Sequence, residues 1–600
     1  MADSGPQTAA LQPSLSVSFP QVLAIGFVVC LVISWSAIKS VWLDGNYGDT
    51  DDAMRMLQIR NWLNGQGWHD LGMPRLDPPG GVVMHWSRVV DVPVAALLRF
   101  FGLFAEPQTA ERLARIVFPL ILQAMLLWAV GLCGRLLAGS FGAAIAVFLI
   151  IASATSVGQF IPGRIDHHAP QIVLLVLMTY ACLGALDPER PRMAALSGFC
   201  AAASLSIAIE NLPFILVLMA IFPLAYAAQG RPMRPALAWM GAGWGVSLIL
   251  CYALFQAPAL WLASACDAFS AVHLRDGLAG ALAMLTLAAF DLWRKPELRE
   301  RIIATGVFGA LAALPLLLDR QCYIDPFSGI DPLVRELWLS NVREALGIKS
   351  LLADHPEGVG VWVMSWALGV MAIAVAARVE HGLSRTRHLA LLALSLAGGA
   401  TAVYMVRSIS SVTPLAILGG VWVVMRVQQA CGRRELLAAA VLFPSLVPFT
   451  MVAWAKALPL DERSIEKEYD KAVARCMETA TYEPLLRLPN GVFLTLPDLG
   501  PFILLHTDHS VIAGPYHRNN HGNRLMYDIF LAKPDEARVM MRAAGLRYVA
   551  MCDWANTATH LFKRAPDGLA AALNSDTPPA WLRPVDAPDA LRVFEVVEAP

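Results

Sequence analysis

Four carboxylates gather in the short stretch that follows the first long apolar run of the chain. Asp44, Asp49, Asp51 and Asp52 fall within nine residues. Carboxylates this close together near a bilayer surface are costly unless a cation, a basic side chain or water offsets their charge. Their oxygens suit Mg²⁺ or Mn²⁺, and Asp51 or Asp49 could orient or deprotonate an acceptor nucleophile. The stretch alone leaves a solvated loop open as the alternative.

A second polar cluster, GRIDHHAPQ, lies between two later apolar runs. It contains Asp166, His167 and His168, and one carboxylate with two imidazoles can complete the coordination of a cation begun by the first stretch. The alternative is an ion pair between Asp166 and Arg164, with the histidines at the membrane interface.

Two further features could serve a substrate with an anionic group. The segment 319–358 mixes aromatic and charged residues and is too long for a plain connector, which suggests a substrate-covering lid. Arg407 lies where one apolar run ends and the next begins, a depth at which an arginine needs an anionic partner. A phosphate or pyrophosphate could be that partner through paired donors, and an outer-loop carboxylate is the alternative.

The tail carries a polar rim on an otherwise apolar stretch. Its members are Asp498, Gly500, Tyr516, His517, Arg518 and Asn519. Such a rim could bind an acceptor, or it could reflect turn chemistry at strand ends.

The composition indicates that these groups belong to a membrane protein. With 56% hydrophobic and only 16% charged residues, the 600-residue chain is typical of an integral membrane protein. No basic domain is present, so nucleic acid is not an expected partner. Thirteen apolar runs have about the length that a bilayer requires: 22–41, 114–133, 139–158, 169–186, 194–209, 211–228, 235–255, 277–293, 302–318, 359–378, 388–405, 410–427 and 435–455. The shorter run 90–104 is expected to be an amphipathic helix in the interface.

The basic residues set the orientation. With a cytoplasmic N-terminus and thirteen spans, the Arg-rich loops all fall inside, as short cytoplasmic loops should. The segment 44–88, Asp166, the loop 319–358 and the tail then share the outer, periplasmic face of an inner membrane. The ten cysteines are scattered singly, a pattern that predicts neither a zinc site nor a disulfide framework.

The chain should therefore have two parts. Residues 1–456 are expected to form a helical polytopic domain with outer loops 42–113 and 319–358, and residues 457–600 a soluble periplasmic domain. In the tail, GVFLTL, HSVIAG and RYVAMC read as buried strands and PDEARVMMRAAG as a helix, which predicts a small α/β domain.

Taken together, these features resemble the STT3-type oligosaccharyltransferases, which are membrane glycosyltransferases of the GT-C fold. The resemblance lies in thirteen spans, a carboxylate loop after the first, an acidic motif after the third, a long loop after the ninth and an outer C-terminal domain. It implies a metal-dependent transfer from a polyprenyl-linked saccharide donor.

The motifs carry over residue by residue. DTDDAMR is similar to the aspartate motif of the family's first loop, which implies that Asp51, with Asp49 as competitor, binds metal and activates the acceptor. IDHHAPQI resembles the second motif, with Asp166 retained and His168 in place of its second acid. Glu344 falls where the family has a catalytic loop glutamate, and Arg407 resembles its pyrophosphate-binding arginine.

The acceptor-binding signature is less complete. LPDLG keeps Asp498 and Gly500 of the family's WWDYG, but both tryptophans are missing. The resemblance therefore implies donor chemistry more strongly than acceptor identity, and the acceptor could be a glycan, a lipid or a protein.

We expect a metal-dependent glycosyltransferase that uses Mg²⁺ or Mn²⁺ bound by Asp51, Asp166 and His168. Asp51, Asp49 and Glu344 are the expected catalytic residues; Arg407, Asp498, His517 and Arg518 are expected to bind substrates, among membrane lipids. A transporter or flippase of a lipid-linked saccharide is an alternative, although such a protein should carry charges near mid-membrane. A non-catalytic envelope scaffold is another.

Overall fold

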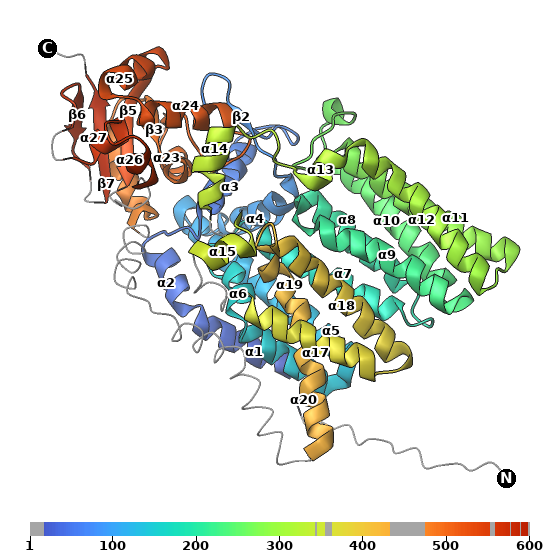
Figure 1. Cartoon of the computed structure of the whole chain (residues 1–600). Coiled ribbons are helices and arrows are strands. Elements are labelled where there is room, and N and C mark those ends of the chain that lie inside the picture. The colour runs from blue at the N-terminus through green and yellow to red at the C-terminus, as the bar shows by residue number, and fades with distance from the viewer. Residues whose placement is uncertain are drawn as a thin grey trace, which may run out of the picture.

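A computed structural model gives the structure of the chain (Figure 1). It describes residues 17–342, 345–354, 363–431, 475–552, 559–575, 578–587 and 590–597. A bundle of long apolar helices makes up most of the molecule, and a small sheet domain lies at one end of the bundle. This is the architecture that the composition and the tail predict.

The predicted crossings fall on helices wherever the structure describes them. The first is a pair bent by 54°, α1 (Phe19–Ile33) and α2 (Trp35–Leu43). Later ones are α7 (His168–Ala185), α8 (Met193–Ile207), α9 (Leu212–Gln229), α10 (Arg234–Phe255), α11 (Ala271–Arg294), α12 (Leu298–Leu318), α17 (Met364–Val379), α18 (Gly382–Ala402), α19 (Ser408–Ala416) and α20 (Leu418–Cys431).

The count of thirteen spans stays a prediction. Among the described residues, seven helices are long and apolar enough to cross a membrane, or eight when the bent pair counts as one. The predicted run 435–455 lies outside the described residues, and so does the predicted domain boundary at 456.

The predicted runs 114–133 and 139–158 form the two arms of one hairpin. They belong to α5 (Pro107–Ile151), whose backbone leaves the helical region at Ala138 and Gly139, with φ of +65° at Gly139. Glycine adopts this conformation without steric cost. The arms then pack closely, because a Cβ on Gly134 would lie only 2.4 Å from the carbonyl oxygen of Gly142.

The outer segment after α2 is folded rather than loose. It contains α3 (Thr50–Leu63), the short antiparallel strands β1 (Gly72–Met73) and β2 (Val82–Val83), and α4 (Arg88–Phe101). The helix predicted over 90–104 is therefore confirmed as α4. Its polar inner side is fixed to α3 by Asp91, which is fully buried between Arg55 and Arg88.

The tail forms the predicted sheet domain. Five strands lie in the order β4-β3-β5-β7-β6, with β3 (Val492–Thr495) parallel to β4 (Ser510–Val511) and to β5 (Leu546–Cys552). The strands β6 (Leu582–Val585) and β7 (Leu591–Val596) are antiparallel to their neighbours. The helix predicted at PDEARVMMRAAG is α25 (Pro534–Ala543).

Two outer segments pack on this domain. Leu76 forms an isolated parallel bridge with Val511, and the guanidinium of Arg75 donates to the carbonyl oxygens of Leu504, Thr507 and His509. From the long loop, α14 (Pro332–Leu337) lies beside α24 (Asn520–Leu531) in Figure 1, and its Val334 joins the apolar core of the sheet domain. The sheet domain is thus fixed against α3, which it contacts at Thr50 and at Arg60.

The expectation that the cysteines form no disulfides is wrong. Cys266 is bonded to Cys322, and Cys476 to Cys552, across 56 and 76 residues. Single cysteines far apart in sequence meet only after folding, so their spacing gave no sign of the pairing. Five others, Cys30, Cys133, Cys182, Cys200 and Cys251, are free and buried.

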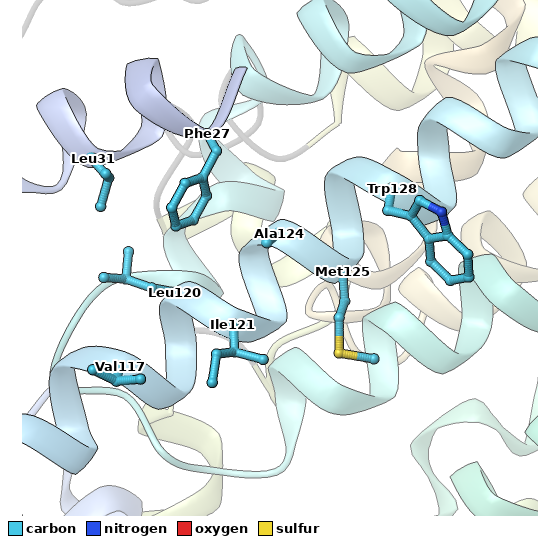
Figure 2. Close-up of a pocket in the computed structure, with 8 residues that line it drawn as sticks. All are labelled: Phe27, Leu31, Val117, Leu120, Ile121, Ala124, Met125 and Trp128. Atoms are coloured by element: carbon cyan, nitrogen blue, oxygen red, sulfur yellow. The ribbon is translucent and has the colours of Figure 1, made fainter. Parts of the chain in front are cut away.

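Two hollows lie away from the carboxylates. An apolar groove of about 540 Å³ runs between α1 and α5, where Phe27 and Leu31 face Leu120, Met125 and Trp128 (Figure 2). A second hollow of about 600 Å³, with both polar and apolar side chains in its lining, lies at the far end of α3 from Asp49, beside β1 and β2. Neither contains the residues that the sequence singles out for chemistry.

Candidate active site

The first carboxylate cluster lies at the start of α3. Asp49 is the N-cap residue, and its Oδ1 accepts a hydrogen bond of 2.6 Å from the backbone N–H of Thr50. Asp51 and Asp52 occupy the first turn, where acidic side chains interact favourably with the helix dipole. Because neighbouring helix residues point about 100° apart, these carboxylates face different surroundings.

Asp52 turns inward and is fully buried. Its Oδ1 accepts a hydrogen bond of 2.6 Å from the backbone N–H of Ile165, and its Oδ2 has no hydrogen-bond partner. Burial raises the pKa of this carboxyl well above its usual range, and the nearby charges of Asp166 and Asp49 add to the effect. Asp52 therefore joins the first cluster directly to the second.

The second cluster is held by the loop before α7. Arg164 forms an ion pair with Asp166 and lies 3.6 Å from Asp49 Oδ2, so one guanidinium bridges both clusters. Burial alone would raise the pKa of Asp166, but the charges of Arg164 and His168 hold it well below its usual range. The Arg164–Asp166 ion pair that the sequence leaves open is thus present, and it lies inside the predicted site.

Asp166 also orients His168. Its Oδ1 accepts from the backbone N–H of His168 at 3.0 Å, and its Oδ2 lies 2.8 Å from the Nδ1 of the same ring. The Nε2 of His168 is buried and has no hydrogen-bond partner. A carboxylate on one imidazole nitrogen, with the other nitrogen open, is a common arrangement around a metal ion.

An acidic residue that the sequence analysis missed completes the cluster. Glu210 lies in the single turn η2 (Ile209–Asn211) between α8 and α9, and its Oε1 accepts a hydrogen bond of 2.6 Å from Arg407 Nη2. The same oxygen lies 3.3 Å from His167 Nε2 and 3.8 Å from His168 Nε2. A single acid at the start of an apolar run carries no recognisable motif, so only the folded chain reveals it.

These residues can hold a cation. Among the described residues, His167, His168 and Glu210 offer ligand atoms that all lie within 4.8 Å of one another. Asp166 and Asp49 add carboxylates nearby, and Asp52 adds an oxygen without a partner. Nitrogen and carboxylate ligands in this combination suit a divalent transition metal as well as Mg²⁺.

Aromatic side chains form the wall between the membrane helices and the sheet domain. Trp86 is fully buried, and its ring contacts His167 at 5.8 Å and Tyr516 at 5.5 Å between centroids. The guanidinium of Arg55 lies 4.7 Å over the same ring and is fixed by Asp91. The sequence offers Arg55 as a possible partner of the carboxylate cluster, but its guanidinium pairs with Asp91 instead. Trp86 was not predicted, because its place depends on the docking of α4 against α3.

On the tail side, Asp498 and Tyr516 face the start of α3. The side chain of Asp498 reaches the surface, but the protein atoms around it limit its hydration and raise its pKa to about 6. The negative charge of Asp49 contributes to this rise. Burial raises the pKa of Tyr516, and Asp51 and Asp49 raise it further. Asp51, Asp49 and Asp498 therefore share one electrostatic environment.

His517 and Arg518 lie beside this wall and bind an acid from another loop. Asp267 accepts from Arg518 Nε at 2.6 Å and lies 2.7 Å from His517 Nε2. Arg518 also donates to the carbonyl oxygen of Met84 at 3.2 Å. Their predicted contact with substrate stays a prediction, and Glu344 lies outside the described residues.

Side chains from the starts of two helices meet at the Glu210 carboxylate, and Glu210 itself lies just before a third. His167 is the N-cap of α7, Arg407 is the N-cap of α19, and η2 leads directly into α9. Helix N-termini carry partial positive charge and unpaired N–H groups, which favour anions. The arrangement thus combines an anion-binding position with a cation-binding position a few ångströms away.

No protein-family model matches the chain, and no curated protein matches it. Solved structures do match. The archaeal oligosaccharyltransferase AglB from Archaeoglobus fulgidus, in complex with an inhibitory peptide and a dolichol-phosphate, gives a TM-score of 0.67 at 14% identity, over 94% of this chain and 72% of that one.

Two other structures of the same enzyme are similar. The form tethered to an acceptor peptide containing the NVT sequon gives a TM-score of 0.67 at 14% identity, over 97% of this chain and 74% of that one. The complex with Zn and sulfate gives 0.62 at 14% identity, over 88% and 68%. The chain has the fold of these membrane glycosyltransferases, which confirms the predicted fold class.

Proposed function

We propose that this chain is a membrane glycosyltransferase. It would transfer a sugar or oligosaccharide from a polyprenyl phosphate or pyrophosphate donor to an acceptor on the outer face of the membrane. The observation that supports this best is the meeting of two acidic segments, at Asp49–Asp52 and at Asp166, beside Arg407. The shared fold with an enzyme solved in complex with a dolichol-phosphate adds support.

The chemistry follows from the charges. The bond between the anomeric carbon and the phosphate oxygen breaks, the phosphate keeps the electron pair, and the acceptor forms the new bond. Arg407 would bind the phosphate through paired donors as negative charge develops on it. Asp51 or Asp49 would orient the acceptor and take its proton, with Glu344 acting from the long loop.

A divalent cation fits the donor set. Asp166 and His168, with Asp51 or Asp49 from α3, would hold Mg²⁺ or Mn²⁺, which supplies charge stabilisation to the leaving phosphate. The Nε2 of His168 and the Oδ2 of Asp52 are buried and have no hydrogen-bond partner, so both atoms could coordinate such a cation. The fold neighbour solved with Zn and sulfate supports a divalent metal beside an anion. Arg164, which lies between Asp49 and Asp166, would have to share these carboxylates with the cation.

The acceptor would approach from the sheet domain. Asp498 lies on that side, and His517 and Arg518 follow Tyr516 in the same wall. The fold neighbour holds an acceptor peptide, but this chain has LPDLG where the family signature carries two tryptophans. We therefore keep a glycan, a lipid and a protein as candidate acceptors.

The site would face the periplasm from an inner membrane. Both disulfides join segments that the charge pattern puts outside, whereas the five cysteines found free among the described residues lie in the apolar helices. Disulfides persist in oxidising compartments such as the periplasm. This agreement supports a cytoplasmic N-terminus and an outer sheet domain.

The test is genetic and chemical. Cells carrying Asp51→Ala or Asp166→Ala in place of the wild-type protein should accumulate the lipid-linked donor and lose the surface glycan made from it. Transfer should fall by roughly a hundredfold or more, since each change removes a base or a cation ligand. The measurement is mass spectrometry of lipid-linked and surface glycans.

Asp77→Asn is the matched control. Asp77 lies on the same outer segment and pairs with the exposed His521 at 3.0 Å, so its loss should leave the glycans unchanged. If both alanine variants reach wild-type levels in the membrane and the glycans also stay unchanged, the proposed function is wrong.

A further inference from the structure

The carboxylate of Glu210 lies at the position where the site offers its donors to an anion. Arg407 Nη2 donates to Glu210 Oε1 at 2.6 Å, and His167 Nε2 and His168 Nε2 lie 3.3 Å and 3.8 Å from the same oxygen. A guanidinium and two imidazoles, from the starts of α19 and α7, thus face one acidic oxygen. A phosphate oxygen is an acceptor of the same kind and competes for the same donors.

The surroundings keep Glu210 in this position. Asn211, the next residue, donates through Nδ2 to the carbonyl oxygen of Gln171 and to Ser204 Oγ, at 3.0 Å and 2.8 Å. Gln171 in turn donates to the carbonyl oxygen of Ala208 at 3.0 Å. These hydrogen bonds hold the turn that carries Glu210 against α7 and α8. The backbone of this turn is therefore fixed at the place from which the Glu210 side chain reaches Arg407.

The site remains accessible at this point. Glu210 and Arg407 keep about a fifth of their side-chain surface exposed, at 21% and 20%, while His167 and His168 keep 6% and 5%. The Glu210–Arg407 pair is thus the part of this cluster that a ligand can reach, and the two imidazoles are buried beside it.

We propose that Glu210 is an internal stand-in for the phosphate of the donor. It holds Arg407 and the two imidazoles in the binding arrangement while no donor is present, and a phosphate oxygen takes its place on Arg407 when the donor binds. The inference rests on the proposed function, because it concerns the same donor site. Glu210 is here a positioning residue that weakens phosphate binding.

The same competition helps the product to leave. After transfer, the polyprenyl phosphate still occupies Arg407, and Glu210 can take the guanidinium back as the phosphate departs. No covalent step is added, since only a hydrogen-bond partner is exchanged. A carboxylate that competes with substrate in this way should lower affinity for both the donor and the product phosphate.

The main alternative is that Glu210 binds the metal ion together with His167 and His168, whose ligand atoms lie within 4.8 Å of one another. The two roles predict opposite results. Removing a competing anion strengthens phosphate binding and lowers the metal affinity only through the lost nearby charge. Removing a ligand weakens metal binding.

The experiment measures binding to the full-length protein in detergent. Farnesyl phosphate and inorganic phosphate are titrated by calorimetry, and Mn²⁺ by electron paramagnetic resonance, for the wild type and for Glu210→Gln. We expect both phosphates to bind about tenfold more tightly to Glu210→Gln, because a neutral hydrogen bond to Arg407 is weaker than a charged one. Mn²⁺ affinity should fall by less than about tenfold, because Glu210→Gln removes a charge near the ion but no ligand.

Glu189→Gln is the matched control, an exposed glutamate on the connection between α7 and α8, and it should bind like the wild type. Glu210→Asp retains the charge but is one methylene shorter, so it should tighten phosphate binding by a smaller factor. If Glu210→Gln does not fold, Glu210→Asp replaces it as the test: tighter phosphate binding supports the inference, and unchanged or weaker binding contradicts it.

Unchanged or weaker phosphate binding, or a tenfold loss of Mn²⁺ affinity, would overturn the inference. Tighter binding of farnesyl phosphate without tighter binding of inorganic phosphate would also overturn it, because Glu210 would then affect the binding of the hydrocarbon chain and not of the phosphate. Arg407→Gln separates this failure from that of the proposed function. If the wild type binds farnesyl phosphate and Arg407→Gln does not weaken it, the donor site itself is wrong.

Discussion

At the residue scale, the acids of the site differ in how strongly they hold a proton. Asp52 is buried and Asp498 lies among protein atoms near Asp49, so both have raised pKa values, whereas Arg164 and His168 lower that of Asp166. One carboxylate is thus kept charged for a cation, while others can change protonation. Such separation of pKa values is typical of sites that carry out acid–base chemistry.

Asp498 provides a test of this arrangement. With a pKa of about 6, roughly nine tenths of it is protonated at pH 5 and roughly nine tenths is ionised at pH 7. If the carboxylate accepts a hydrogen bond from the acceptor, kcat/KM should rise with pH through about 6. Asp498→Asn cannot ionise, so its profile should lose this rise.

The measurement is the pH profile of transfer at a fixed, saturating donor concentration. Asp77→Asn, which alters an acid outside the site, should keep the wild-type profile. A profile for Asp498→Asn that rises through pH 6 as the wild type does would mean that another group causes the rise and that Asp498 does not meet the acceptor in its charged form.

Some of these residues could be predicted from the sequence and some could not. Asp166, His168 and Arg407 stood out because a charged group beside an apolar run needs a partner. The choice among Asp49, Asp51 and Asp52 depends on where α3 begins, since a shift of one residue turns a side chain by about 100°. Glu210 is one acid without a pattern, and it meets Arg407 across 197 residues.

At the element scale, the start of α3 is positioned by α4. Asp91 of α4 is fully buried and bonds Arg55 at 2.8 Å and Arg88 at 3.0 Å, and both arginines are also buried. Arg55 in turn lies over Trp86, which touches His167 and Tyr516. A buried carboxylate thus connects the outer helices to the wall of the site.

Removal of this carboxylate should be strongly destabilising. Asp91→Ala would leave two buried guanidinium groups without their anion, at a cost of about 3–5 kcal/mol. The melting temperature and the folded yield in detergent should both fall. Asp567→Ala is the control, because its pair with Lys533 is exposed on both sides and should contribute less than about 1 kcal/mol.

A melting temperature for Asp91→Ala equal to that of the control would contradict this account of α4. The sequence did predict a helix over 90–104 from its amphipathic pattern, but it did not predict that Asp91 faces inward. Asp91 could as well have been read as a polar residue at the membrane surface, because only packing against α3 makes it a core residue.

The long apolar elements were the easiest to predict, since about twenty apolar residues have few other uses. The turn at Ala138–Gly139 shows what the hydrophobic pattern could not predict. Both apolar runs beside it are helical, as predicted, but their close pairing depends on Gly134 and Gly142. The strands β3, β4 and β5 were also recognised from short apolar runs, but β6 and β7 were not. The strand order β4-β3-β5-β7-β6 has no local signal in the sequence.

At the scale of the whole molecule, three separate parts build the candidate site. The bundle supplies Asp166, Glu210 and Arg407, the outer segment supplies the acids of α3, and the sheet domain supplies Asp498 (Figure 1). Backbone pairing of Leu76 with Val511 and the cluster of Asp267 with Arg518 fix these parts together. The donor would thus meet the acceptor between a membrane part and a water-exposed part.

The most direct test is donor turnover by the purified protein. Lipid-linked saccharides and a cell-envelope fraction, which supplies the acceptor, are prepared from the Asp166→Ala strain, incubated with wild-type protein in liposomes with Mn²⁺ or with EDTA, and analysed by mass spectrometry. The account predicts that, with Mn²⁺ only, the donor disappears and the polyprenyl phosphate or pyrophosphate appears in equal amount. An intact donor under both conditions, with folded protein that binds Mn²⁺, would contradict it.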